Sequence, residues 1–105
     1  MPYIKKEQRE RIDGAVQQLT ESLKNLANPF VVEVDAGLLN YAVTKLLIGL
    51  GPVNYADYNA LVGVLECIKL EFYRRAVAPY EEKKIVANGD VYNSELLRAH
   101  AKEED

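Results

Sequence analysis

The sequence predicts an all-α protein, because it contains three apolar seams with helical spacing and no hairpin signal. Each seam repeats every three or four residues, which is the period of one face of a helix. Only one short run favours a strand. We therefore expect a small bundle of three main helices followed by a short C-terminal helix. A chain of 105 residues is long enough for one domain with a modest core.

The first expected helix reaches residue 28, and Pro29 ends it because a proline disfavours helical backbone in the residue before it. We expect the charged residues 1–11 to be extended or to form a first frayed turn. The apolar seam of this helix is spaced by four, three, four and three residues: Ile12, Val16, Leu19, Leu23 and Leu26.

Residues 30–34, FVVEV, favour a strand in isolation. A lone strand is not stable, and no partner strand is visible, so we interpret this run as an extended connector. A short strand that pairs between subunits is the alternative. The second helix is expected over residues 36–50, where Gly51-Pro52 ends it. It has a wide apolar face: Leu39, Val43, Leu46, Leu47 and Leu50.

Residues 54–92 form the most informative segment. Asn54 is a good N-cap for the third helix, with Asp57 three residues later. Pro79 is expected to interrupt this helix and to begin a short helix over residues 80–87. We expect the first two helices to pack against the seam of the third, which is Tyr58, Leu61, Leu65, Ile68 and Phe72. Residues 1–92 then form one domain, and residues 93–105 form a partly mobile acidic tail.

Composition excludes several classes of protein. The net charge is −3, with 13 basic and 16 acidic residues, which argues against a duplex nucleic-acid binder but allows a small anion held by local cations. Cys67 is the only cysteine, so no intrachain disulfide forms and a reducing compartment fits. The charged N-terminus is no signal peptide, and the apolar run at 46–50 is far short of the roughly 20 residues that span a bilayer. We expect a cytoplasmic protein that does not enter the membrane.

Polar and aromatic residues follow a second stripe on the third helix, at intervals of seven. Lys69 joins this stripe, because it lies three residues after Glu66 and four before Tyr73. The stripe supplies an acceptor, a cation and two rings, which suit a nucleotide-like ligand. The alternative is that Glu66 pairs with Lys69 on a solvated face while the tyrosines shield the edge of the core. The stripe consists of Asn59, Glu66, Tyr73 and Tyr80.

Two polar pairs at a spacing of four lie on the second helix: Asn40 with Thr44, and Tyr41 with Lys45. Amides and hydroxyls can form hydrogen bonds to a base or a ribose, and lysine can form an ion pair with a phosphate. The alternative is a hydrogen bond from Asn40 to the polar stripe of the third helix.

Arg74 and Arg75 have two interpretations as well. Arginines favour the negative end of a helix, and one of the two could also form a fork on a phosphate.

The expected ligand site lies where these faces of the second and third helices meet. Antiparallel packing through the short loop 51–54 would bring them to a common edge, with Tyr80 as a lid. The candidate ligand-binding residues are Asn40, Tyr41, Thr44, Lys45, Glu66, Lys69, Tyr73, Arg74 and Tyr80.

No catalytic set is assembled in the sequence. Glu66 and Glu71 are five residues apart and do not share a helical face. The pattern that holds magnesium in all-α nucleotide pyrophosphatases, an E-x-x-E cluster opposite another acidic pair, is absent. His100 and Cys67 have no partner for nucleophilic catalysis. The sequence also has too few Cys and His residues to form a zinc site. We therefore expect that the protein is not an enzyme and that it binds no cofactor and no metal.

Three stretches of the chain resemble a known family: MPYIKKEQRERID at residues 1–13, the stretch 38–48 with LNYAVTKLL, and residues 54–92 with LVGVLECIKLEFYRRAVAPYEEKKIVANGDVY. The family consists of small uncharacterised proteins of bacteriophages, prophages and bacterial genomes. This resemblance implies a protein that acts in the host cytoplasm. By analogy with other small phage proteins, it also implies a counter-defence role, such as a helical sponge that sequesters a nucleotide-derived signal.

The sequence thus favours a non-enzymatic binding protein that sequesters a nucleotide-like signal or a host protein. The alternative is a structural or adaptor protein that acts only through protein contacts. We also expect a homo-oligomer, most simply a two-fold dimer, because residues 30–34 and the second helix offer more apolar surface than one short bundle buries.

Overall fold

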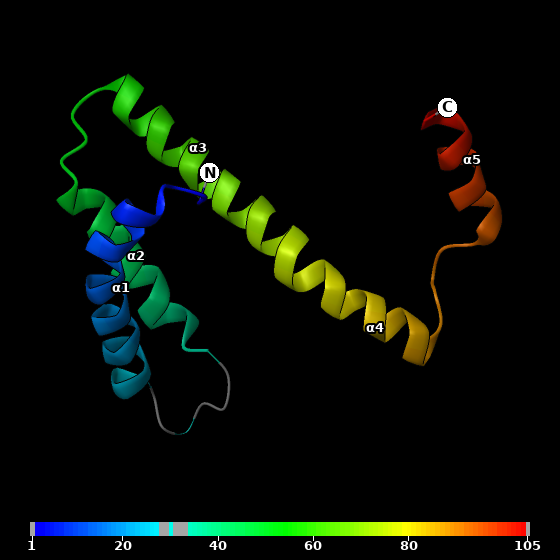
Figure 1. Ribbon diagram of the computed structural model, residues 1–105, viewed down its shortest axis with the longest axis horizontal. Helices are drawn as coiled ribbons and strands as arrows, with labels where there is room; N and C mark the ends of the chain where they lie inside the picture. Colours follow the sequence, from blue (N-terminus) through cyan, green and yellow to red (C-terminus); the bar gives the residue numbers. More distant parts are fainter. Residues whose placement is uncertain (1, 28–29, 31–33, 105) are drawn as a thin grey trace. The chain divides into compact units, whose positions relative to one another are not determined.

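The structure is a computed structural model that describes residues 2–27, 30 and 34–104, with side chains as far as Ala99. Within these residues every regular element is helical and no strand is present, which confirms the all-α prediction (Figure 1). Residues 31–33 of the expected connector lie outside the described residues. The elements are α1 (Lys6–Leu26), α2 (Ala36–Gly49), α3 (Tyr55–Phe72), a π-helical turn η1 (Tyr73–Val77), α4 (Ala78–Asn88) and α5 (Ser94–Glu104).

Side-chain caps begin α2 and α3. The carboxylate of Asp35 accepts a hydrogen bond from the Leu38 amide at 3.0 Å, which satisfies one of the free donors at the start of α2. Asn54 Oδ1 accepts from the Asp57 amide at 2.9 Å, and Asp57 Oδ2 accepts from the Val53 amide at 3.0 Å. The bond from the Asp57 amide to the Asn54 side chain confirms Asn54 as the predicted N-cap.

Helix α1 begins earlier than expected. It starts at Lys6, so residues 6–11 are helical rather than extended. The sequence KEQRER consists of strong helix formers, and the Lys5 amide donates to Gln8 Oε1 at 3.3 Å, which ties down the first turn. The α5 helix likewise gives residues 94–104 of the expected tail a regular structure.

Pro79 does not interrupt the helix, contrary to prediction. Helices α3, η1 and α4 follow one another without a non-helical residue between them. Pro79 has no amide hydrogen and its ring opposes a regular α-turn before it. The chain accommodates it with a wider turn, in which the Ala78 amide donates to the Tyr73 carbonyl five residues back. The predicted stop at Gly89 is confirmed, because Gly89 follows the last residue of α4 with φ of 91°.

The chain divides into two compact units, residues 1–66 and 67–105, with the boundary inside α3. The first unit contains α1, α2 and most of α3. The second contains the end of α3 together with η1, α4 and α5. A single domain over residues 1–92 remains a prediction.

The apolar seams of the helices lie at the surface of the chain. No described side chain is fully buried. Tyr58 on the α3 seam is 55% exposed and Leu65 is 38% exposed, so the expected cover from the first two helices is missing on this part of α3. The α1 seam is in the same state, with Ile12, Val16 and Leu19 all exposed. The apolar side chains that define these helices therefore have too few partners within the described chain.

Candidate functional site

The predicted polar pair on α2 is present. Thr44 Oγ1 donates a hydrogen bond to Asn40 Oδ1 at 3.3 Å, as the spacing of four predicts. Both residues line an open hollow of about 540 Å³, together with Tyr41. The hydroxyl, amide and phenol around this hollow can donate to and accept from a small polar ligand. Lys45 lies one residue beyond Thr44 and is exposed.

The α3–α4 part of the predicted site is already occupied by internal contacts. The guanidinium of Arg74 donates from Nη2 to both carboxylate oxygens of Glu71, at 3.0 and 2.9 Å. Glu66 and Lys69 also each take part in an interaction. A phosphate would therefore have to compete with Glu71 for Arg74, which weakens the expected phosphate role of this arginine.

The Tyr73 phenol donates a hydrogen bond to Glu81 Oε1 at 2.9 Å. The contact depends on η1, because its wider turn adds one residue to the helix. Residue 81 is thereby placed over residue 73 as a spacing of seven would place it in a regular helix. The predicted stripe has Tyr80 in that place, but the side chain bonded to Tyr73 is that of Glu81. Tyr80 instead meets Lys84, whose Nζ lies 5.5 Å from the ring centroid, within range of a cation–π contact.

The hydrogen bond to Glu81, and then its negative charge, raise the pKa of Tyr73 above the ordinary value of 10.0. A raised tyrosine pKa means that the folded chain holds the proton more tightly than the unfolded chain. The stabilising contribution of this contact is therefore fully present below the ordinary pKa, and it is lost as the pH rises through the raised pKa of the folded state.

Replacing Glu81 with glutamine should lower the pKa of Tyr73 toward its ordinary value, because the nearby negative charge is removed. Ultraviolet titration of phenolate formation above pH 9 measures this change. The sequence contains seven tyrosines, so the Tyr73→Phe variant identifies the component that belongs to Tyr73. An unchanged titration curve in Glu81→Gln would show that the contact does not persist in solution.

The predicted site residues thus form two groups, each held by its own unit. Asn40, Tyr41 and Thr44 lie together on α2, whereas Tyr73, Arg74 and Tyr80 belong to the second unit. A single site that joins both groups stays a prediction.

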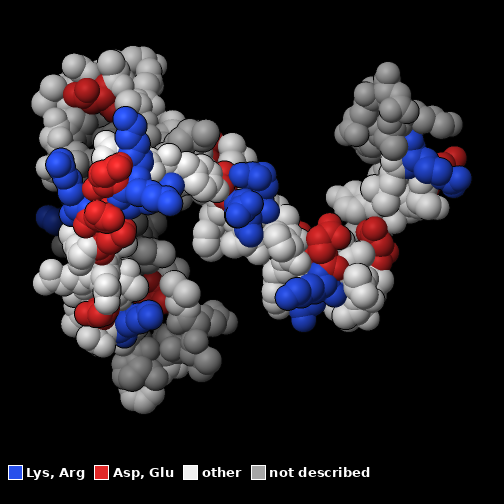
Figure 2. Space-filling view, in the orientation of Figure 1, with Lys and Arg blue, Asp and Glu red and all other residues white. Residues whose placement is uncertain are grey.

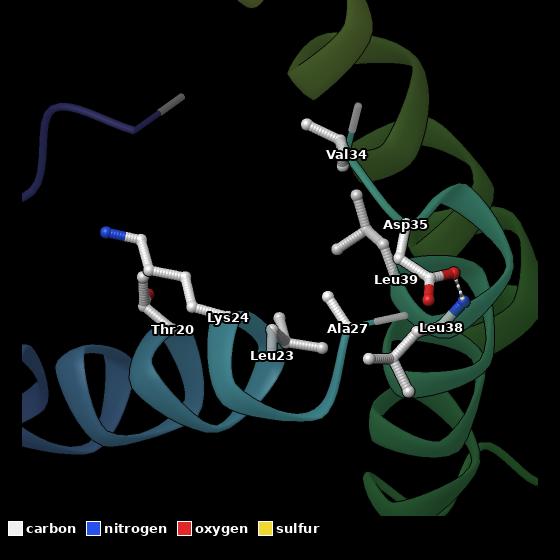
Figure 3. A pocket seen from close by; sticks show the side chains of 8 residues that line it. All are labelled: Thr20, Leu23, Lys24, Ala27, Val34, Asp35, Leu38 and Leu39. Atoms are coloured by element: carbon white, nitrogen blue, oxygen red, sulfur yellow. Dashed lines mark hydrogen bonds between the residues drawn. The ribbon is translucent and has the colours of Figure 1, made fainter. Parts of the chain in front are cut away.

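The sequence did not predict a hollow of about 390 Å³ that lies between the last turns of α1 and the start of α2. Figure 3 shows Leu23 and Ala27 on one side of it and Leu38 and Leu39 on the other. Thr20, Lys24 and Asp35 are the polar residues at its wall, but the Asp35 carboxylate is engaged as the cap of α2. The predicted seams include Leu23 and Leu39 but not Leu38, and their spacing does not show which helix lies opposite.

Charge does not single out a further site. Figure 2 shows basic and acidic side chains intermixed on the face it displays, with no large basic patch. Among the described residues, no group of three or more His, Cys, Asp or Glu side chains is placed to hold a metal ion. None of the helices in the described ranges combines the length and the apolar character needed to cross a bilayer.

Comparison with known proteins places the chain in a family without supplying an activity. No curated protein and no solved structure matches it. A family model does match, over residues 1–91, and its description is a domain of unknown function. On this match, the chain belongs to the family of the domain of unknown function DUF6899.

Proposed function

We propose that this is a non-enzymatic protein that acts through protein–protein contacts, and that it does so as a homo-oligomer. The observation that carries the proposal is the exposure of large apolar side chains along α3. Ile68 is 57% exposed and Phe72 is 65% exposed, although both belong to a regular helical seam. A regular apolar seam on a helix is normally packed against another element, so we infer that the exposed seam of α3 requires a partner.

The polar contacts support a role in protein contacts rather than in anion binding. Arg74 is paired with Glu71, and the Tyr73 hydroxyl donates its hydrogen bond to Glu81. Both contacts join side chains of the same continuous helix from α3 to α4. They fix the positions of these side chains on a surface that can pack against another protein. A phosphate site instead needs cations that are directed at the ligand.

Light scattering on the purified full chain tests the proposal. We expect a mass that is a multiple of 11.8 kDa at micromolar concentration. A mass of one chain over the whole accessible concentration range would contradict it.

The hollow on α2 favours a second candidate function. Asn40, Tyr41 and Thr44 line one side of it with groups that suit a base or a ribose. Together with the resemblance to phage and prophage proteins, this supports a counter-defence sponge for a nucleotide-derived signal, with Lys45 near a phosphate.

Ligand that co-purifies with the protein separates the two functions. The sponge predicts excess absorbance near 260 nm and a nucleotide mass after denaturation, whereas action through protein contacts alone predicts neither. If a nucleotide is found, Tyr41→Ala and Lys45→Ala should abolish its binding and change the free energy of unfolding by less than about 1 kcal/mol, because both side chains are exposed. Tyr55→Ala is the matched control, because Tyr55 is exposed on α3 outside the predicted site.

A further inference from the structure

The α3 seam has the spacing of a coiled-coil interface. Its five residues alternate at three and four positions, which is the a/d pattern of a heptad repeat. Such a narrow seam fits a second helix of the same period, packed at a small crossing angle. The flanking positions add Val62 and Val64, which are both exposed.

The area of this face fits a stable contact. A bulky side chain offers on the order of 150–250 Å² for burial. With the exposed fractions of Tyr58, Leu65, Ile68 and Phe72 and of the two flanking valines, the face leaves roughly 600 Å² of apolar side chain open. A standard interface buries about 800 Å² on each partner, so this face supplies most of what one needs.

The charges at the edges of the seam indicate how two copies would pair. Lys69 flanks one edge, and Asp57 and Glu71 flank the other, where Glu71 is also ion-paired with Arg74 of its own chain. In a parallel pair of helices, the edge with Lys69 lies next to the acidic edge of the partner. In an antiparallel pair, the two acidic edges would face each other, which is unfavourable.

We propose that α3 forms a parallel two-fold contact with α3 of a second copy of this chain, through Tyr58, Leu61, Leu65, Ile68 and Phe72. A two-fold contact uses the same surface on both copies, and a symmetric apolar seam with balanced edges meets this requirement. The inference rests on the proposed function, and it adds which helix makes the contact and in which direction.

Ile68 and Leu70 form a matched pair for the test. They are aliphatic, two residues apart on α3, and 57% and 58% exposed, but Ile68 lies in the seam and Leu70 lies on the opposite side. Ile68→Ala should raise the dissociation constant of the dimer on the order of 100-fold, because both copies lose a packed aliphatic side chain and leave a cavity in the interface. Leu70→Ala should change it less than about 3-fold.

Sedimentation equilibrium of wild type and both variants measures these constants, and far-ultraviolet circular dichroism checks that the helices persist. If wild type is oligomeric but the two variants behave alike, the contact lies elsewhere and the proposed function stands. If wild type is a monomer, both proposals fail.

Disulfide trapping tests the direction of the pair. In a Cys67→Ala background, Phe72→Cys should form a disulfide-linked dimer on mild oxidation, because residue 72 of each copy meets its counterpart in a parallel pair. An antiparallel pair separates these two residues along the helix. The absence of a linked dimer from an oligomeric variant would overturn the parallel arrangement.

Discussion

Replacing Leu65 with glutamate is expected to convert the protein to a monomer and to remove most of its cooperative unfolding. Leu65 is the middle residue of the α3 seam and the least exposed of those seam side chains that lie at the surface, at 38%. A two-fold contact would bury two carboxylates beside each other, at a cost of several kcal/mol. We therefore expect a loss of more than about 3 kcal/mol in the free energy of unfolding, which is large for a single substitution.

Urea unfolding followed by circular dichroism measures this effect, with Leu70→Glu as the control for a charge on the other side of α3. The control should keep the oligomeric mass and lose little stability. Equal behaviour of the two variants would show that the seam is not the contact surface.

Dilution of the wild-type protein is expected to lower its melting temperature on the order of 10 °C per 100-fold. No described side chain is fully buried within one chain, so contacts between copies would supply much of the stability. A 100-fold change in the concentration of a partner is worth about 2.7 kcal/mol when binding is linked to folding. For a domain of this size, each kcal/mol shifts the melting temperature by roughly 4–8 °C.

Differential scanning calorimetry at concentrations from about 1 to 100 µM tests this dependence. The Ile68→Glu variant should show no dependence on concentration, because its seam cannot pair. A wild-type melting temperature that is independent of concentration would mean that each chain folds on contacts of its own.

The parts of the fold that depend on short-range chemistry were predicted from the sequence. The Asn54–Asp57 cap follows from two residues three positions apart, and the Gly89 stop follows from a conformation that only glycine adopts readily. The seams on α1 and α3 follow from spacing alone.

The effect of Pro79 could not be predicted in the same way. A proline excludes a regular turn, but it does not determine whether the helix ends or widens. The choice of a π-turn decides that Glu81 rather than Tyr80 meets Tyr73, so the predicted stripe is wrong beyond residue 73. The packing of the seams could not be predicted from the sequence either. Spacing shows that a face is apolar, but it does not show which helix covers that face.

Hydrogen–deuterium exchange resolved by peptide tests the pairing of α3 most directly. The full chain is labelled well above and well below its dissociation constant, and α3 is compared with α5, which carries only two exposed leucines, Leu96 and Leu97. We predict that the amides of residues 58–72 exchange much more slowly at high concentration, while those of α5 exchange equally at both concentrations. Equal exchange of α3 at both concentrations, in a protein that remains folded, would contradict a contact between copies through this helix.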